Sequence, residues 1–394
     1  MASFISEYKN IFKDHMWSSF FSAWGLRQFA NGLMVVYSPL FFYTNGKGLS
    51  FVLAILAVQS FFNAVMRLPV AIAITGIKNI KIIFASATIA LGLVYFGYYL
   101  FIDNNLAIIV LAGLEGALLA IVNSCFVYIF SATQKRRSVG SQVGLQNDLS
   151  YSMAILAIFI GGLIASAFGL GANFILASIF LILASIRLLN MKIVWPHKNK
   201  IIKYKQTSFS ANWPKYISGG ASIIDLTAVT VLWPLTLVVV NYFSYKNIGL
   251  LISAGLALSL AVNLLIGRYD DDIDRAKNAL KKSILGTLLV YILRIISIYS
   301  LIGAILLTII GIVVRGIFEI NYSVIFYNKL KKTKNKILFI AEHESISSYM
   351  LTIYFLLLII INIIFDSVIL TLIASLLIAS MAVSIAGLID TERE

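Results

Sequence analysis

The sequence has few of the residues that build disulfides, metal sites or soluble surfaces. Its 394 residues include one cysteine, Cys125, and three histidines. A single cysteine excludes an intrachain disulfide framework. We expect no metal site and no cofactor, because no zinc-ligand spacing, P-loop or dinucleotide-binding glycine pattern is present. Charged residues make up 12% of the chain, about half the usual share in soluble domains, so a soluble enzyme is not expected.

Long apolar runs take the place of the missing charges, and 60% of the residues are hydrophobic. A helix that crosses a bilayer needs about 20 mainly apolar residues. By this criterion we expect twelve spans, near 17–43, 50–73, 82–102, 106–131, 150–169, 172–191, 217–240, 248–267, 283–300, 301–327, 338–364 and 367–389. The sequence therefore predicts a polytopic, all-α membrane protein.

The basic residues are distributed unevenly between the two sides of these spans. Of the 31 Lys and Arg residues, 24 fall on the side of the chain ends, and only Lys47 and Lys246 fall on the other. Cytoplasmic loops of membrane proteins carry such an excess. We therefore expect a multi-pass protein of the cytoplasmic membrane with both termini in the cytoplasm. The net charge of +14 then reflects topology, and no nucleic-acid partner is expected.

A long polar stretch divides the chain into two similar halves. Residues 193–216 carry two prolines and several lysines, and we interpret them as a cytoplasmic linker between a six-helix bundle over 1–192 and another over 217–394. Similar local sequences recur at offsets of 195 to 198 residues, pairing Pro39 with Pro234, Asn123 with Asn321, and Asp148 with Glu344. Three matches at nearly one offset indicate a duplicated unit.

One loop carries a motif that points to a known family. In GRYDDDIDRAKN, Gly267, Asp271 and Arg275 stand at the positions of the cytoplasmic loop signature of the Major Facilitator Superfamily, although Asp274 replaces its second glycine. The equivalent loop of the first half keeps only Gly76 and a nearby lysine. The chain thus resembles that superfamily, which implies two six-helix bundles that alternate in exposing a central site.

Several charged residues fall deep inside the expected spans. Glu115 lies within LAGLEGALLA, and Arg27, Asp225 and Arg315 lie at similar depth, with Glu319 one turn from Arg315. Charges in a bilayer are costly, so they usually mark a functional path. These residues belong to the first, fourth, seventh and tenth spans, which line the central cavity in the family that the chain resembles. Arg294 is also deep, but the sequence gives no role for it.

Helical periodicity places further polar residues beside these charges. Asn31 shares a face with Arg27 on the first span. Ser218 shares one with Asp225 on the seventh span, and Tyr322 shares one with Arg315 on the tenth. We expect Asn31, Asn123 and Tyr322 to form hydrogen bonds in the site. Structural pairing is the alternative: Arg315 with Glu319, Glu115 with Arg27 or Arg315, and a protonated, hydrogen-bonded Asp225.

Two further roles follow from the same residues. Glu115 and Asp225 are candidates for proton exchange, because burial favours the protonated form of a carboxylate. We expect Gly267, Asp271 and Arg275 to form a cytoplasmic gate, with Asp148 and Glu344 contacting neighbouring basic loops.

Together these features predict a secondary transporter, a symporter if proton-coupled, that moves a small polar or zwitterionic solute and functions as a monomer in the lipid bilayer. A lipid translocase or scramblase on the same scaffold is one alternative, and a non-transporting receptor or assembly protein is another. The sequence leaves the solute, the coupling ion and the direction of transport open.

Overall fold

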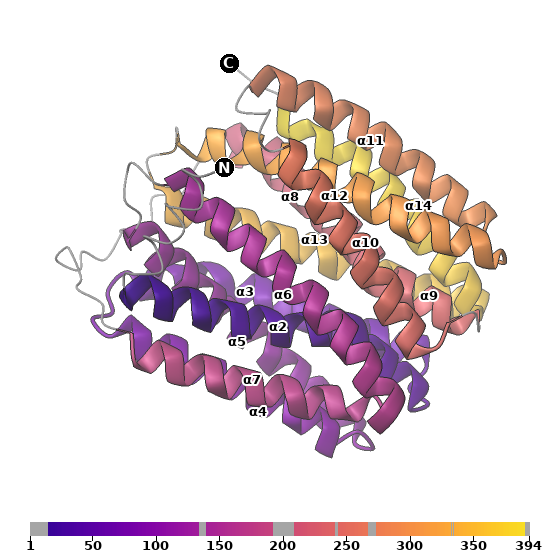
Figure 1. Cartoon of the computed structure of the whole chain (residues 1–394), viewed down its shortest axis with the longest axis horizontal. Helices are drawn as coiled ribbons and strands as arrows, with labels where there is room; N and C mark the ends of the chain where they lie inside the picture. The colour runs from indigo at the N-terminus through magenta and orange to yellow at the C-terminus, as the bar shows by residue number, and fades with distance from the viewer. Residues whose placement is uncertain are drawn as a thin grey trace.

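The computed structural model describes residues 15–133, 139–191, 209–240, 243–266, 273–331, 333 and 335–390. Within these residues the fold is all-helical and consists of twelve rods, as the sequence predicted. The rods form two bundles, one coloured indigo to magenta and the other salmon to yellow (Figure 1).

Six rods form the N-terminal bundle and six the C-terminal bundle. The first six are α2 (His15–Thr44), α3 (Leu49–Ile74), α4 (Ile80–Leu100), α5 (Asn105–Thr133), α6 (Val139–Phe168) and α7 (Gly171–Leu189). The second six are α8–η1–α9 (Phe209–Thr227, Ala228–Leu232, Trp233–Val239), α10 (Tyr245–Ile266), α11 (Ile273–Ile296), α12 (Leu301–Lys331), α13 (Lys336–Phe365) and α14 (Val368–Ala386), which the short helix η2 (Gly387–Asp390) follows. Helix α8 thus begins inside the stretch interpreted as the linker.

Ten of the described rods are long and apolar enough to cross a membrane. The two that fall short are α2 and α11, which also stand among the twelve expected spans. Helix α11 begins with the charged stretch IDRAKNALKK, and α2 carries Arg27 and several serines. Both pack into their bundles, so tertiary packing compensates for their lower hydropathy.

The rods alternate in direction and define two ends of the molecule. We call the end at which α2 begins and α14 ends the terminal face, and the other end the opposite face. Three tight turns lie at the opposite face, where Gly46 (φ 79°), Gly169 (φ 84°) and Asp366 (φ 44°) adopt left-handed backbone conformations. Such conformations suit glycine, and Asp is among the few other residues that tolerate them.

The seventh rod is irregular beside the deep charge Asp225. Residues Ala228–Leu232 form a π-helical turn between α8 and α9. Pro234 lies at the start of α9, and proline cannot donate the backbone hydrogen bond of a regular helix. The wider turn accommodates this loss, and such turns often occur at functional sites.

Two pairs of helices join the bundles: α3 packs along α13, and α6 packs along α10. The second pair is especially close at Gly162 and Gly249, where a Cβ on Gly249 would lie 3.0 Å from the Cα of Gly162. Small residues allow such close approach of membrane helices.

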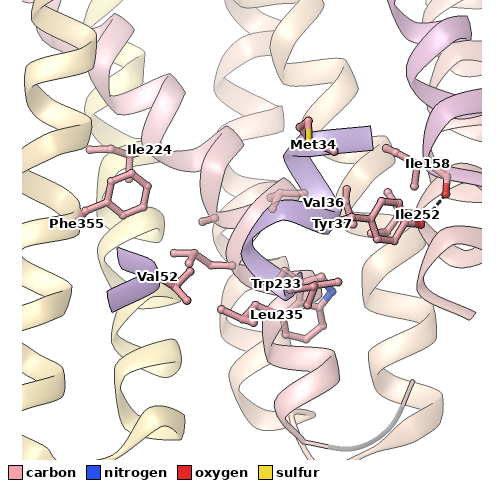
Figure 2. Close-up of a cluster of buried hydrophobic side chains, with 14 of the residues drawn as sticks. Met34, Val36, Tyr37, Val52, Ile158, Ile224, Trp233, Leu235, Ile252 and Phe355 are labelled. Carbon is pink, nitrogen blue, oxygen red and sulfur yellow. Dashed lines mark hydrogen bonds between the residues drawn. The ribbon is translucent and has the colours of Figure 1, made fainter. Parts of the chain in front are cut away.

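Apolar contacts between the bundles concentrate toward the opposite face. One buried cluster contains residues of both bundles, including Met34 and Tyr37 of α2 with Trp233 and Leu235 of α9 (Figure 2). We call the part of this cluster around these four residues the apolar seal. Toward the terminal face, the aromatic cluster around Trp17 contains residues of the N-terminal bundle alone. Among the described residues, the cluster that joins the bundles thus takes its N-terminal-bundle members from the half near the opposite face.

Candidate functional site

The charged residues of the C-terminal bundle form one buried cluster. Nε of Arg315 lies 2.5 Å from Oδ2 of Asp225, and Tyr291 donates a hydrogen bond of 2.7 Å to Oδ1. Asp225 is fully buried and Arg315 is 5% exposed. Because separating such a pair would leave a charge without compensation, the ion pair fixes α8 against α12.

Arg294, to which the sequence assigned no role, lies close to this pair. Its guanidinium stacks over Trp233 at 4.7 Å and donates to the carbonyl of Leu307 at 3.2 Å. It also interacts electrostatically with Asp225. Two arginines and a tyrosine therefore interact with Asp225.

The polar stripes expected on the seventh and tenth rods face each other. On the terminal side of the ion pair, Tyr322 and Ser218 form a hydrogen bond of 3.2 Å. On the side of the opposite face, Trp233 donates to Thr308 at 2.7 Å. Arg315 also reaches the carbonyl of Ser222, at 3.3 Å. Much of this polar surface is thus used to join the two rods.

A second group of polar residues lies in the N-terminal bundle. Nη2 of Arg27 donates to Oδ1 of Asn123 at 2.5 Å, which joins the first and fourth rods. The guanidinium also lies over the ring of Trp24 at 4.8 Å. Its other terminal nitrogen, Nη1, makes no hydrogen bond, although Arg27 is only 7% exposed.

Glu115 contacts hydroxyl groups rather than a cation. Tyr98 of α4 donates to its Oε2 at 2.8 Å, and Tyr95, one turn earlier, also interacts with it. The adjacent Gly116 fixes this position, because a Cβ there would lie 2.1 Å from the carbonyl oxygen of Gln59. The carboxylate is directed into the N-terminal bundle, and the structure pairs it with neither Arg27 nor Arg315.

The two groups approach each other through α6. Trp24 donates to Ser150 at 2.9 Å, and the next residue, Tyr151, interacts with Glu319 of the other bundle. Glu319 in turn acts electrostatically on Arg315. The direct partner of Arg315 is nevertheless Asp225 rather than Glu319.

Polar contacts also join the bundles nearer the terminal face. Arg67 of α3 forms an ion pair with Glu344 of α13, and the Ser345 hydroxyl donates to the carbonyl of Ala64 at 2.7 Å. The sequence predicted that Glu344 would contact a basic loop, whereas its partner here is an arginine inside a membrane span.

The other expected site residues have more scattered positions. Asn31 is exposed, one turn from Arg27, and Asp148 is partly buried on α6. Arg275 is exposed at the start of α11. Gly267 and Asp271, expected in the gate, lie outside the described residues.

Sequence reasoning did not identify the partners of these charges. Tyr95, Tyr98 and Tyr291 lie on α4 and α11, which are not among the four spans expected to line the cavity. Nothing in the sequence distinguishes a tyrosine there from the other residues of an apolar span. Arg67 did carry a signal, because it is an arginine inside an apolar run. Its spacing did not reveal Glu344 as its partner.

Comparison with known proteins identifies solved structures with a similar fold, but no matching family model or curated protein. No family model and no curated protein matches the chain. Among solved structures, the nucleoside transporter NupG is similar at a TM-score of 0.66 and 14% identity, covering 93% of this chain and 96% of that one. A single-residue variant of NupG is similar at a TM-score of 0.64 and 13% identity, covering 94% and 97%.

At these identities the likeness shows the fold alone. It extends over nearly the full length of both chains, and it agrees with the family resemblance of the loop motif. The chain is a multi-pass membrane protein with the Major Facilitator fold.

Proposed function

We propose that the protein is a secondary transporter that moves a small polar or zwitterionic solute across the cytoplasmic membrane by alternating access, coupled to protons. Both termini and the terminal face would lie in the cytoplasm, on the side where the basic residues accumulate.

One observation carries this proposal: buried charges from both bundles lie on the terminal side of an apolar seal. Arg27 precedes Met34 and Tyr37 on α2, and Asp225 precedes Trp233 on the seventh rod. A solute that reached these charges from the terminal face would meet closed apolar packing beyond them. Rocking of the bundles would then open the site to the opposite face and close it to the terminal face.

The solute class follows from the mixed signs of the charges. Arg27 supplies a cation in one bundle, and Glu319 a partly buried anion in the other. Opposite charges on facing walls suit a polar or zwitterionic solute better than an apolar one. Nucleosides belong in the test panel, because the similar solved structure is named a nucleoside transporter.

A thermal-stability screen of the purified protein against amino acids, nucleosides, sugars and organic acids tests the proposal. A ligand of the site should raise the melting temperature of the wild type and have little effect on Arg27→Gln and Asp225→Asn. Asp366→Asn is the matched control, because Asp366 lies at the opposite face and asparagine tolerates its backbone conformation. A ligand that stabilises both site variants as well as the wild type would show that the substituted residues do not form its binding site.

Uptake into liposomes tests coupling and direction. Accumulation should increase when an inward proton gradient is imposed, and equal accumulation without the gradient would refute proton coupling. Exchange of fluorescent phospholipids between leaflets, with no solute uptake, would instead support a scramblase.

A further inference from the structure

One buried cation of the interior lacks the carboxylate that the others have. Arg67 pairs with Glu344, Arg315 pairs with Asp225, and Arg294 interacts with Asp225. Among the described residues, Arg27 forms no ion pair: it donates to the amide of Asn123, lies over the ring of Trp24 and interacts electrostatically with Tyr95.

The unused donor of Arg27 is a specific atom. Its Nη1 is buried and makes no hydrogen bond. A buried donor without a partner costs about 1–3 kcal/mol, and more when it is charged. An anionic oxygen beside Nη1 would recover that cost and neutralise the guanidinium, which binds carboxylates through two parallel hydrogen bonds.

Glu115 is the complementary group, a buried carboxylate without a cation. Its neighbours are the hydroxyls of Tyr98 and Tyr95. Tyr95 also interacts electrostatically with Arg27, so one side chain lies between the unpaired acid and the unpaired base. An ionised Glu115 would balance Arg27 across Tyr95, and a protonated Glu115 would leave Arg27 to balance another anion.

We propose that Arg27 binds a carboxylate group of the solute and that Glu115 takes up one proton as that carboxylate binds. This inference depends on the proposed transport function and specifies its substrate class and coupling. The proton passes from water to a carboxylate oxygen of Glu115, and no other bond forms or breaks. The buried charge is then the same before and after binding, which avoids burying a net charge.

Because Arg27 supplies a single positive charge without an ionic partner, its surroundings favour a carboxylate over a phosphate. A carboxylate carries one negative charge at neutral pH, whereas a phosphate monoester carries about 1.5–2. Binding a phosphate at Arg27 would leave a buried excess of negative charge.

Among the described residues, other ionisable groups lie near Arg27 and Glu115, but none forms an ion pair with either of them. Arg67 of α3 faces Arg27, but Glu344 already neutralises it. On α6, Tyr151 is engaged by Glu319, and Asp148 adjoins Leu149, which packs against α2.

Matched pairs of acids and amides test the inference. The probes are acetate with acetamide, lactate with lactamide, benzoate with benzamide, and nicotinate with nicotinamide. Their affinities for the full-length purified protein are measured by thermal stability at constant ionic strength. A mildly acidic and a mildly alkaline buffer are used, both above the usual pKa of a carboxylic acid. We expect the wild type to prefer the acid of at least one pair, more strongly in the acidic buffer.

The variants separate the two residues. Arg27→Gln should weaken binding of the acid about tenfold or more, the loss expected for one charge-assisted hydrogen bond, and Arg27→Lys should restore part of it. Glu115→Gln should bind the acid equally in both buffers, because it resembles the protonated state. Asp366→Asn, at the opposite face, should behave as the wild type. Monodisperse elution and the unliganded melting temperature verify folding of each variant.

Three results would overturn the inference: no preference for any acid over its amide, an acid preference that survives Arg27→Gln, or a pH effect that survives Glu115→Gln. If neutral solutes bind and accumulate in liposomes while acids do not, the transporter function stands and only this inference fails. If no solute binds or accumulates, both fail.

Discussion

At the residue scale, the partner of each buried charge decides what that charge can do. Asp225 and Glu115 lie at similar depth, but Asp225 has Arg315 within 2.5 Å, whereas Glu115 has the Tyr98 hydroxyl. Cations stabilise the ionised form of a carboxylate, while neutral donors in an apolar region do so less. Of the two candidates for proton exchange, Glu115 has the more suitable surroundings.

The pairing of Asp225 with Arg315 predicts a non-additive effect on stability. Arg315→Met should destabilise the fold by about 3–5 kcal/mol, because it leaves a buried carboxylate without its cation. The double variant Arg315→Met with Asp225→Leu should recover much of this loss, since neither charge then remains. Melting temperatures in detergent measure both. Losses that simply add would mean that the pair is not coupled.

The packing at Gly116 predicts a steric effect. Gly116→Ala should lower the melting temperature and weaken ligand binding, because the added Cβ meets the backbone of Gln59 at 2.1 Å. Gly48→Ala is the matched control, since a Cβ at Gly48 has no atom within 4 Å. Equal melting temperatures for the two variants would contradict the close packing of α3 on α5.

At the scale of elements, α3 and α13 form a polar seam between the bundles. Ser50 and Asn362 form a hydrogen bond of 2.7 Å near the opposite face, and Asn63 donates to Ser348 at 3.1 Å farther along. Arg67 and Glu344 continue the series. Polar contacts exchange partners more readily than a close-packed apolar core, so this seam suits moving bundles.

A charge swap tests the ion pair in this seam. Arg67→Glu alone should lower transport and stability, because two carboxylates would then face each other. Adding Glu344→Arg should restore at least part of both, since the swapped pair has the same attraction. Uptake into liposomes and the melting temperature are the measurements. No rescue by the double change would show that the two residues are not coupled.

At the scale of the whole molecule, the apolar seal lies between the buried charges and the opposite face. Because the shared apolar cluster takes its N-terminal-bundle residues from the half near the opposite face, we predict that a solute reaches the charges from the terminal face. This asymmetry is what alternating access requires of one end state.

Cysteine labelling tests both access and orientation. In a Cys125→Ala background, Asn31→Cys should react with a membrane-impermeant maleimide in inside-out vesicles and little in right-side-out vesicles, because Asn31 is exposed on the terminal side of the seal. Adding Trp233→Ala should increase labelling in right-side-out vesicles. The reverse pattern in the first variant would place the terminal face outside the cell.

Much of the architecture follows from local sequence. The apolar runs determine which segments are helical in lipid, since a spanning helix must satisfy its own backbone hydrogen bonds. The basic loops indicate orientation, and the partial loop motif indicates the fold. Helical periodicity also placed Ser218 with Asp225 and Arg315 with Tyr322, and these two stripes lie face to face in the structure.

The partners of the charges are decided only by tertiary structure. Glu115 meets Tyr98 and Tyr95, and Arg67 meets Glu344 across the two bundles. Such contacts depend on helix rotation and on the angle between the bundles, which arise from packing among many side chains. The sequence by itself thus determined the rods and the positions of the charges along them. Packing decided which of the described charges have an ionic partner and which, like Arg27, do not.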